Sequence, residues 1–181
     1  TAIGKIHGEA YAEKLVAVHE PRSPLTEAYR QLRTNLQFST LDINLKSVLL
    51  TSPSPMEGKS VNAANLAVVL AQAGMSVVLV DCDLRRPVQH KVFGLTNSNG
   101  LTNLLMSRDG MLAGGRRMPG LEVSPAPASF SLDGALQESG IRGLRILTSG
   151  PLPPNPAEVL GSERMRLLLE TLEQQTDIVV F

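Results

Sequence analysis

Residues 46–83 read KSVLLTSPSPMEGKSVNAANLAVVLAQAGMSVVLVDCD and contain a β-strand pattern, a loop, a helix pattern and a second strand pattern. The two nearly all-apolar runs, Lys46–Thr51 and Ser76–Cys82, are typical of strands in a sheet that is covered on both faces. The alanine-rich run Ser60–Ala73 predicts a helix between them, with Gly74 as its C-terminal cap. This order predicts a βαβ unit with a right-handed crossover.

The same alternation of strands and helices continues on both sides of this unit. Ser23 and Pro24 are typical of a helix start, and apolar residues then recur at helical spacing. Further elements are expected as strands at Ile3–Ile6, Leu144–Thr148 and Asp177–Phe181, and as helices at Glu9–Val18, Val88–Phe93, Leu101–Met106, Leu132–Glu138, Ala157–Leu160 and Ser162–Gln174. The pattern predicts an α/β fold in which a parallel β-sheet is flanked by helices.

The chain of 181 residues has the length of a single domain. We divide it into a lead-in or linker at residues 1–22 and a domain at residues 23–181. Residues 107–128 are rich in glycine and proline and are expected to form an inserted loop. In a parallel sheet the ligand binds at the carboxyl ends of the strands, so the segments after Thr51, Val80 and Phe181 are expected to carry the site.

Composition and charge exclude several classes of function. Apolar residues make up 43% of the chain and charged residues 19%, so the chain is not disordered throughout. Lys+Arg 17 balances Asp+Glu 17, and aromatic residues make up 3%, so we expect no nucleic-acid partner. The single cysteine excludes an internal disulfide and a zinc site built from several cysteines.

The loop after the first strand of the βαβ unit carries a phosphate-binding pattern. The usual pattern is G-x-x-x-x-G-K-[ST]; here Pro53 replaces the first glycine, and Gly58-Lys59-Ser60 is intact. Gly58 allows close approach to phosphate oxygens, Lys59 supplies positive charge, and the Ser60 hydroxyl is a ligand type for Mg²⁺. We predict ATP and Mg²⁺ as ligands, bound by Ser54, Pro55, Met56, Glu57, Gly58, Lys59, Ser60 and Val61. The alternative is an ordinary turn with a solvated lysine.

A second candidate site follows the second strand of the unit, in the segment VDCDLRRP at residues 80–87. Strand alternation predicts that Asp81 and Asp83 share one face, where two like charges favour a nearby cation such as Mg²⁺. Arg85 is expected to neutralise phosphate charge or to pair with Asp83. Cys82 is expected to be a small packing residue. The alternative is a solvated strand end with a local ion pair.

Together these motifs resemble the cytoplasmic catalytic domain of the bacterial tyrosine kinases (BY-kinases) of capsular and exopolysaccharide biosynthesis. That family belongs to the branch of P-loop NTPases that also contains the MinD and ParA ATPases. The stretches that carry the resemblance are Pro55–Ser60 with Ala63–Ala67, Val80–Pro87, Ser23–Leu36 and Pro153–Leu160. The resemblance implies an ATP-dependent protein-tyrosine autokinase with a P-loop NTPase fold.

The resemblance also assigns roles to individual residues. It implies that Lys59 and Ser60 bind the ATP phosphates and Mg²⁺, and that Asp83 lies at the metal. Asp81 is a second candidate at the metal, and it is the residue expected to orient or deprotonate the acceptor tyrosine. Arg85 is expected to support the γ-phosphate. The family's Walker B acid is expected directly after a strand such as the one that ends at Phe181.

The resemblance further implies partners. Glu27, Arg30 and Arg33 match the family's E-x-x-R-x-x-R signature, which implies ring-like self-association. At this spacing the three charges form a slanted stripe on one helix, and the alternative is a solvated face with a local Glu–Arg pair. A transmembrane activator of polysaccharide chain length is expected in cis or in trans, which places the domain at the cytoplasmic face of the bacterial inner membrane.

Two other functions remain open at this point. One is a MinD/ParA-like ATPase switch without kinase activity; its additional lysine is expected at position 54, where this chain has Ser54. The other is a structural nucleotide sensor in a polysaccharide export complex, which would bind Mg·ATP without turnover.

Met56 stands where many kinase relatives have glycine, so the backbone is more restricted at this loop position.

Overall fold

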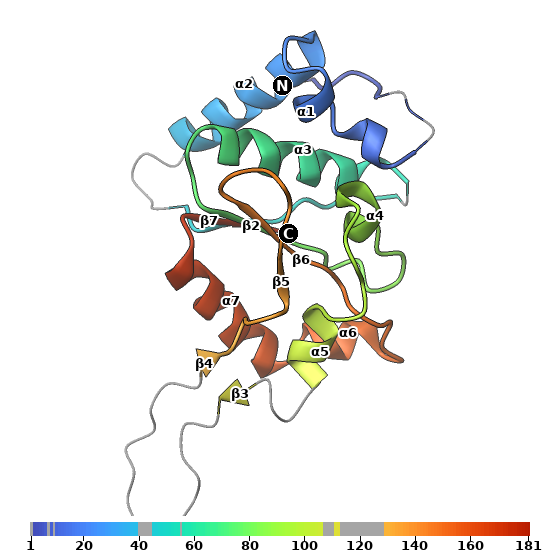
Figure 1. Cartoon of the computed structure of the whole chain (residues 1–181), viewed down its shortest axis with the longest axis vertical. Helices are drawn as coiled ribbons and strands as arrows, with labels where there is room; N and C mark the ends of the chain where they lie inside the picture. The colour runs from blue at the N-terminus through green and yellow to red at the C-terminus, as the bar shows by residue number, and fades with distance from the viewer. Residues whose placement is uncertain are drawn as a thin grey trace, which may run out of the picture.

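The structure is a computed structural model and describes residues 2–6, 8, 10–39, 45–54, 56–106, 111–112 and 129–181 (Figure 1). Its helices are η1 (Ala12–Lys14, a 3₁₀-helix), α1 (Val16–His19), α2 (Pro24–Ser39), α3 (Lys59–Gln72), α4 (Gln89–Phe93), α5 (Leu101–Met106), α6 (Pro156–Leu160) and α7 (Glu163–Gln175). Its strands are β1 (Ser47–Val48), β2 (Val77–Val80), β3 (Met111–Leu112), β4 (Ser129–Phe130), β5 (Leu136–Glu138), β6 (Leu144–Leu147) and β7 (Ile178–Val180).

The central sheet has the strand order β1-β7-β2-β6-β5. The first four strands are parallel, with Val78 of β2 opposite Arg145 of β6 on one side and Val179 of β7 on the other. β5 pairs antiparallel with β6 at one edge, and β3 and β4 form a separate antiparallel pair. The predicted α/β class is confirmed, with one antiparallel edge strand that the sequence did not predict.

Helices cover both faces of this sheet, as Figure 1 shows: α1, α2 and α3 lie on one face, and α5, α6 and α7 on the other. Alternate residues of β2 enter two separate hydrophobic clusters. Val77 and Leu79 pack with the buried face of α3, whereas Val78 and Val80 pack with α5 and α7. Burial on both faces is the reason why this strand is apolar throughout.

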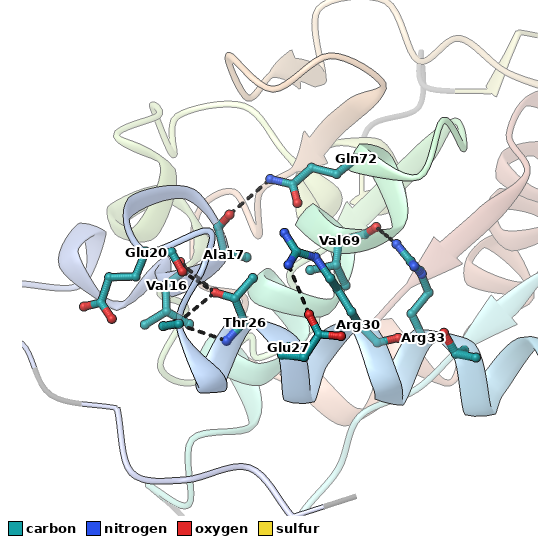
Figure 2. Close-up of polar contacts among 11 residues, drawn as sticks. Val16, Ala17, Glu20, Thr26, Glu27, Arg30, Arg33, Val69 and Gln72 are labelled. Atoms are coloured by element: carbon teal, nitrogen blue, oxygen red, sulfur yellow. Dashed lines mark hydrogen bonds and ion pairs between the residues drawn. The ribbon is translucent and has the colours of Figure 1, made fainter.

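Three polar side chains fix the amino-terminal segment to the helical layer. Asn65 of α3 is fully buried; its amide accepts from the Ala17 N–H at 3.0 Å and donates to the Lys14 carbonyl at 2.8 Å. The Thr26 hydroxyl donates to the carbonyl oxygen of Val16, and Gln72 donates to that of Ala17 (Figure 2). The segment around α1 is therefore packed as part of the core. The division of the chain at residue 22 stays a prediction.

Several element predictions are corrected by the structure. Residues 3–6 form no strand; Ile3 and Ile6 instead pack as partly buried side chains against the cluster around α3. In place of the single helix expected at Glu9–Val18, the structure has the two short helices η1 and α1. They are separated by Leu15, whose φ of −78° and ψ of 66° are not helical.

The helix expected at Leu132–Glu138 is also wrong. Gly134 has φ +74°, which interrupts helical geometry, and the segment then continues as strand β5. The strand expected at Lys46–Thr51 is confined to β1. β7 is paired on both sides, as expected for an interior strand. The predicted loop at residues 107–128 lies outside the described residues except for Met111–Leu112.

Candidate functional site

A cavity of about 660 Å³ lies at the carboxyl ends of β1, β2 and β7. Its walls come from the segments that follow these strands: Leu49–Ser54 after β1, Asp81–Asp83 after β2, and Phe181 after β7. Lys59 and Ser60, at the start of α3, complete the wall. The structure therefore brings together three chain segments that are far apart in sequence, and the volume is within the range of about 300–1,000 Å³ typical of small-ligand sites.

The phosphate loop reaches the start of α3 through two residues in the left-handed backbone region. Gly58 has φ +82°, and it is the N-cap of the helix that begins at Lys59. Met56 has φ +65° and is 91% exposed, so a non-glycine residue pays a backbone cost there. The first N–H groups of the 14-residue helix α3 have no partner within the helix and point toward the loop.

Hydrogen bonds within the loop hold this shape. The Ser52 hydroxyl donates to the Ser54 carbonyl at 2.8 Å, and the Ser54 N–H donates to Glu57 Oε2 at 3.3 Å. The Tyr29 hydroxyl of α2 donates to Asn62 Oδ1 at 2.6 Å, one turn into α3. Pro55, a predicted member of this site, lies outside the described residues.

Lys59 and Asp83 are brought together across the mouth of the cavity. The Lys59 ammonium lies 3.7 Å from Asp83 Oδ2. The other oxygen, Oδ1, accepts from the N–H groups of Arg85 and Arg86, at 3.3 and 3.0 Å. The Lys59 side chain is 33% exposed and that of Asp83 is 27% exposed, so the pair contributes little to stability, about 0–1 kcal/mol, and both groups remain accessible to a ligand.

Asp81 lies deeper and has different partners. Its Oδ1 accepts from the Asp83 N–H at 3.2 Å, and its Oδ2 accepts from the N–H groups of Val88 and Gln89 at 3.0 and 2.9 Å. The carboxylate thereby caps the start of α4 and shapes the loop between β2 and α4. Burial raises the pKa of Asp81 to about 6, against the lowering effect of these backbone hydrogen bonds. β2 ends at Val80, so strand alternation does not govern where the two aspartates point.

Gln89 is a residue of this cavity that the sequence did not predict. It is 3% exposed, and its Nε2 donates to the Ser60 carbonyl at 2.9 Å. Its Oε1 is buried and has no hydrogen-bond partner among the described residues, although the side chain lines the cavity. No motif signals this role, because it depends on α4 folding back over the start of α3.

The remaining residues of the acidic segment lie at the rim or in the wall. Arg85 and Arg86 are exposed and line the same cavity. Burial and the charge of Asp81 raise the pKa of Cys82 to about 12, so its side chain is a neutral thiol at pH 7. Cys82 is partly buried and packs against the hydrophobic cluster of α5 and α7, beside Leu136 and Val159. This contact supports the expectation that Cys82 is a packing residue.

The three residues of the expected self-association signature lie on α2 (Figure 2), and none of them lines the cavity of the phosphate loop. Arg30 Nη1 lies 3.2 Å from Glu27 Oε2. Arg33 Nη1 donates to the Val69 carbonyl of α3 at 3.1 Å, and its Nε is buried without a hydrogen-bond partner among the described residues. The three residues line a shallow cavity of about 450 Å³.

Residues 48–179 match the family model described as CbiA, the CobQ/CobB/MinD/ParA nucleotide binding domain. The chain is 41% identical over 180 residues to the tyrosine-protein kinase YwqD of Bacillus subtilis (strain 168); the match covers 99% of the chain and 67% of YwqD. The chain belongs to the bacterial tyrosine-protein kinase family. Its domain is accordingly a nucleotide-binding domain with the P-loop NTPase fold.

Solved structures of this kinase family have the same fold. The crystal structure of the chimerical protein CapA2B2 superposes with a TM-score of 0.79 at 34% identity, covering 99% of the chain and 69% of CapA2B2. The kinase domain of the Escherichia coli tyrosine kinase Etk gives a TM-score of 0.77 at 30% identity, covering 96% of the chain and 60% of that domain. The chain thus spans about two thirds of the length of YwqD and of CapA2B2, 60% of the Etk kinase domain, and 20% of the length of the curated Etk protein.

The residues of the cavity fit a magnesium nucleotide. The helix start and Lys59 suit phosphate oxygens, and Ser60 and Asp83 offer the oxygen ligands that Mg²⁺ prefers. Gln89 Oε1, a buried acceptor without a partner among the described residues, suits a water molecule of a hydrated cation. Within the described ranges, no group of three or more His, Cys, Asp or Glu side chains forms a metal cage.

Proposed function

We propose that the chain is the catalytic part of an ATP-dependent protein-tyrosine autokinase that regulates capsular or exopolysaccharide synthesis and export. The observation that carries the proposal is the Lys59–Asp83 pair, 3.7 Å apart, at the rim of the cavity formed by the phosphate loop. It places a cation for phosphate oxygens beside a carboxylate for the metal or the acceptor. The kinase relatives supply the tyrosine specificity of the proposal.

The reaction is a transfer of the γ-phosphoryl group of ATP to a tyrosine hydroxyl. A bond forms between the phenolic oxygen and the γ-phosphorus, the bond from that phosphorus to the oxygen bridging the β-phosphate breaks, and ADP leaves. The contribution of the protein is positioning and charge neutralisation by Lys59 and the start of α3, with Arg85 near the γ-phosphate. Mg²⁺, when bound by Ser60 and Asp83, would neutralise charge on the phosphates.

The phenolic proton must leave during the transfer. Asp81 is the proton acceptor proposed from the family resemblance, and its pKa of about 6 is close to the working pH that suits a general base. Its backbone hydrogen bonds to Asp83, Val88 and Gln89 hold it in place. We propose that it acts together with Asp83, which is the more exposed of the two carboxylates.

The alternative is an ATPase switch that releases the γ-phosphate to water. To separate the two, full-length protein is incubated with Mg²⁺ and γ-labelled ATP, and label in phosphotyrosine and in free phosphate is measured. The kinase proposal predicts phosphotyrosine that is lost in Lys59→Met. Label in free phosphate alone would support the switch instead, and Mg·ATP binding without turnover would support the nucleotide sensor.

Self-association through α2 is also part of the proposal. Support comes from the cavity of about 450 Å³ on α2 that Glu27, Arg30 and Arg33 line together, where a second copy could meet these charged side chains. Arg30→Glu is expected to dissociate the assembly in sedimentation velocity, whereas Arg166→Glu on α7 makes the same charge change away from α2 and should leave it intact.

We further propose that the chain works with the cytoplasmic segment of a membrane activator, in cis or in trans, at the inner membrane. No helix within the described ranges is long and apolar enough to cross a membrane. The similar chimerical protein CapA2B2 carries the names of two components, which supports a two-part system. Co-purification of full-length protein with a membrane protein from solubilised membranes tests this association; recovery of the kinase without one would contradict it.

A further inference from the structure

A second pair of cavities lies beside the phosphate site, on the side of the amino-terminal segment. The first, about 330 Å³, is lined by Tyr11 and Lys14 together with the phosphate loop and Val88. The second, about 470 Å³, continues over α4 to Pro151 and Leu152. Tyr11, Arg86 and Val88 line both, so the two form one continuous depression, here called the trough.

The inner end of the trough meets the phosphate site. Lys59, Ser60 and Asp83 line both the first cavity of the trough and the 660 Å³ cavity. A group that lies in the trough can therefore reach the Lys59–Asp83 pair, which also lines the larger cavity. This is the approach that an acceptor needs if the nucleotide occupies the larger cavity, because donor and acceptor must meet at the same residues.

The charge of the trough is one-sided although the chain is neutral overall. Beyond the Lys59–Asp83 pair, the charged side chains that line it among the described residues are Lys14, Arg86 and Lys91, all basic. His90 also lines it, but burial and the charge of Lys91 lower its pKa, so at neutral pH it adds no charge. A surface of this kind attracts acidic groups.

The trough also offers apolar contact at both ends. Met56, at the inner end, is 91% exposed, and Leu152, at the outer end, is 60% exposed. Tyr11 stands between them, with its ring 5.2 Å from the Lys14 ammonium. Exposed apolar side chains spaced along a charged depression suit an extended peptide, whose side chains alternate between apolar and charged contacts.

We propose that the trough binds the acceptor polypeptide and selects tyrosines that are flanked by acidic residues. Lys14, Arg86 and Lys91 are the specificity residues, and Leu152 contacts the segment farther from the tyrosine. The inference rests on the proposed kinase function. Tyr29 is not such an acceptor, because it is fully buried and its hydroxyl is bonded to Asn62.

The test compares two peptides, one with glutamates and one with lysines around a single tyrosine, as substrates of the full-length protein with Mg·ATP. Each exposed ion pair contributes a factor of about two to five, so the acidic peptide is expected to have a kcat/KM at least about tenfold higher. Lys91→Glu should reduce this preference by about tenfold, mainly through KM, while the affinity for ATP stays unchanged. The preference should also weaken at high salt.

Arg142→Glu is the matched control. Arg142 is exposed and lies before β6, at the amino-terminal edge of the sheet, and the substitution changes the net charge equally. Tyrosine phosphorylation without an acidic preference, or an equal loss in both variants, would overturn the inference and leave the kinase proposal standing. If neither peptide nor the protein itself is phosphorylated, the proposed function fails and the inference fails with it. Phosphorylation confined to Tyr11, and lost in Tyr11→Phe, would also overturn the inference. The acceptor would then be a residue that lines the trough, and not a polypeptide bound in it.

Discussion

The ammonium group of Lys59 and the carboxylate of Asp83 lie 3.7 Å apart and connect the phosphate loop to the acidic segment. Lys59 is the first residue of α3, and Asp83 follows β2, so the contact joins the segments that follow the two strands of the βαβ unit. Both side chains are partly exposed, so separating the two charges costs little free energy. Under the proposed function, a magnesium nucleotide would replace this contact, with phosphate on Lys59 and the metal on Asp83.

Asp83→Asn is expected to reduce phosphoryl transfer by about 10²- to 10³-fold, since an electrostatic contact to the reacting phosphate is lost. The fold should remain, because an amide oxygen can still accept from the N–H groups of Arg85 and Arg86. Steady-state kinetics and urea unfolding measure the two quantities. Asp133→Asn, which changes an exposed aspartate outside the site, is the control. Equal activity of Asp83→Asn and the wild type would rule out a role for Asp83 at the metal.

Gln89→Leu tests the residue that closes the cavity from α4. The substitution removes the hydrogen bond to the Ser60 carbonyl and the unpaired acceptor Oε1, while it keeps the volume and the burial. We expect kcat to fall about tenfold and the Mg²⁺ concentration needed for half-maximal rate to rise. Gln137→Leu, which alters a glutamine of β5 that is bonded to Thr96, should change neither. Unaltered Mg²⁺ dependence in Gln89→Leu would exclude the assigned role.

The raised pKa of Asp81 predicts a specific pH dependence of stability. Its value of about 6 in the folded protein exceeds the ordinary 3.8, so between these pH values the folded state binds more protons than the unfolded state. The free energy of unfolding should therefore fall as the pH rises from about 4 to about 6, by roughly 1.4 kcal/mol per unit at most, and then level off. The difference between wild type and Asp81→Asn, measured by urea unfolding across this range, isolates the effect. A flat difference would contradict it.

Met56→Gly should stabilise the loop. Met56 has φ +65°, a region that costs a non-glycine residue about 1 kcal/mol, and its exposed side chain loses no packing when removed. We expect the free energy of unfolding to rise by a few tenths to about 1 kcal/mol, because part of the gain is offset by the entropy of glycine. Met56→Ala keeps the backbone cost and should show no gain. A similar gain in both variants would mean that side-chain removal, not backbone strain, is responsible.

The sequence was sufficient to predict the βαβ unit because each signal was local. The apolar run around β2 correctly predicted burial on both faces, and Gly58-Lys59-Ser60 marked the start of α3 within one residue. The same prediction was wrong for the run around β1, which lies at the edge of the sheet, is only partly buried and is followed by Leu49 at 71% exposure. The segment Leu132–Glu138 was misassigned because its apolar spacing is compatible with both a helix and a strand. Only the positive φ of Gly134 and the pairing with β6 select the strand.

The site was less predictable wherever it depends on chain segments that are distant in sequence. The pairing of Lys59 with Asp83 follows from the topology, but the capping of α4 by Asp81 depends on how residues 82–88 turn. Gln89 carries no motif and becomes part of the site only through packing. The trough likewise combines Tyr11 with Arg86, and no sequence pattern relates the amino-terminal segment to the acidic segment.

The most direct test of the central claim is the affinity of the full-length protein for Mg·ATP, measured by isothermal titration calorimetry in wild type, Lys59→Met and Lys46→Met. Lys46 donates to the Thr176 carbonyl outside the cavity, so its substitution controls for the loss of a lysine. The account predicts that Lys59→Met weakens binding at least about tenfold, as expected for a charge-assisted contact to phosphate of roughly 1.5–3 kcal/mol, and that Lys46→Met does not. Equal affinity in wild type and Lys59→Met would contradict the assignment of the phosphate loop.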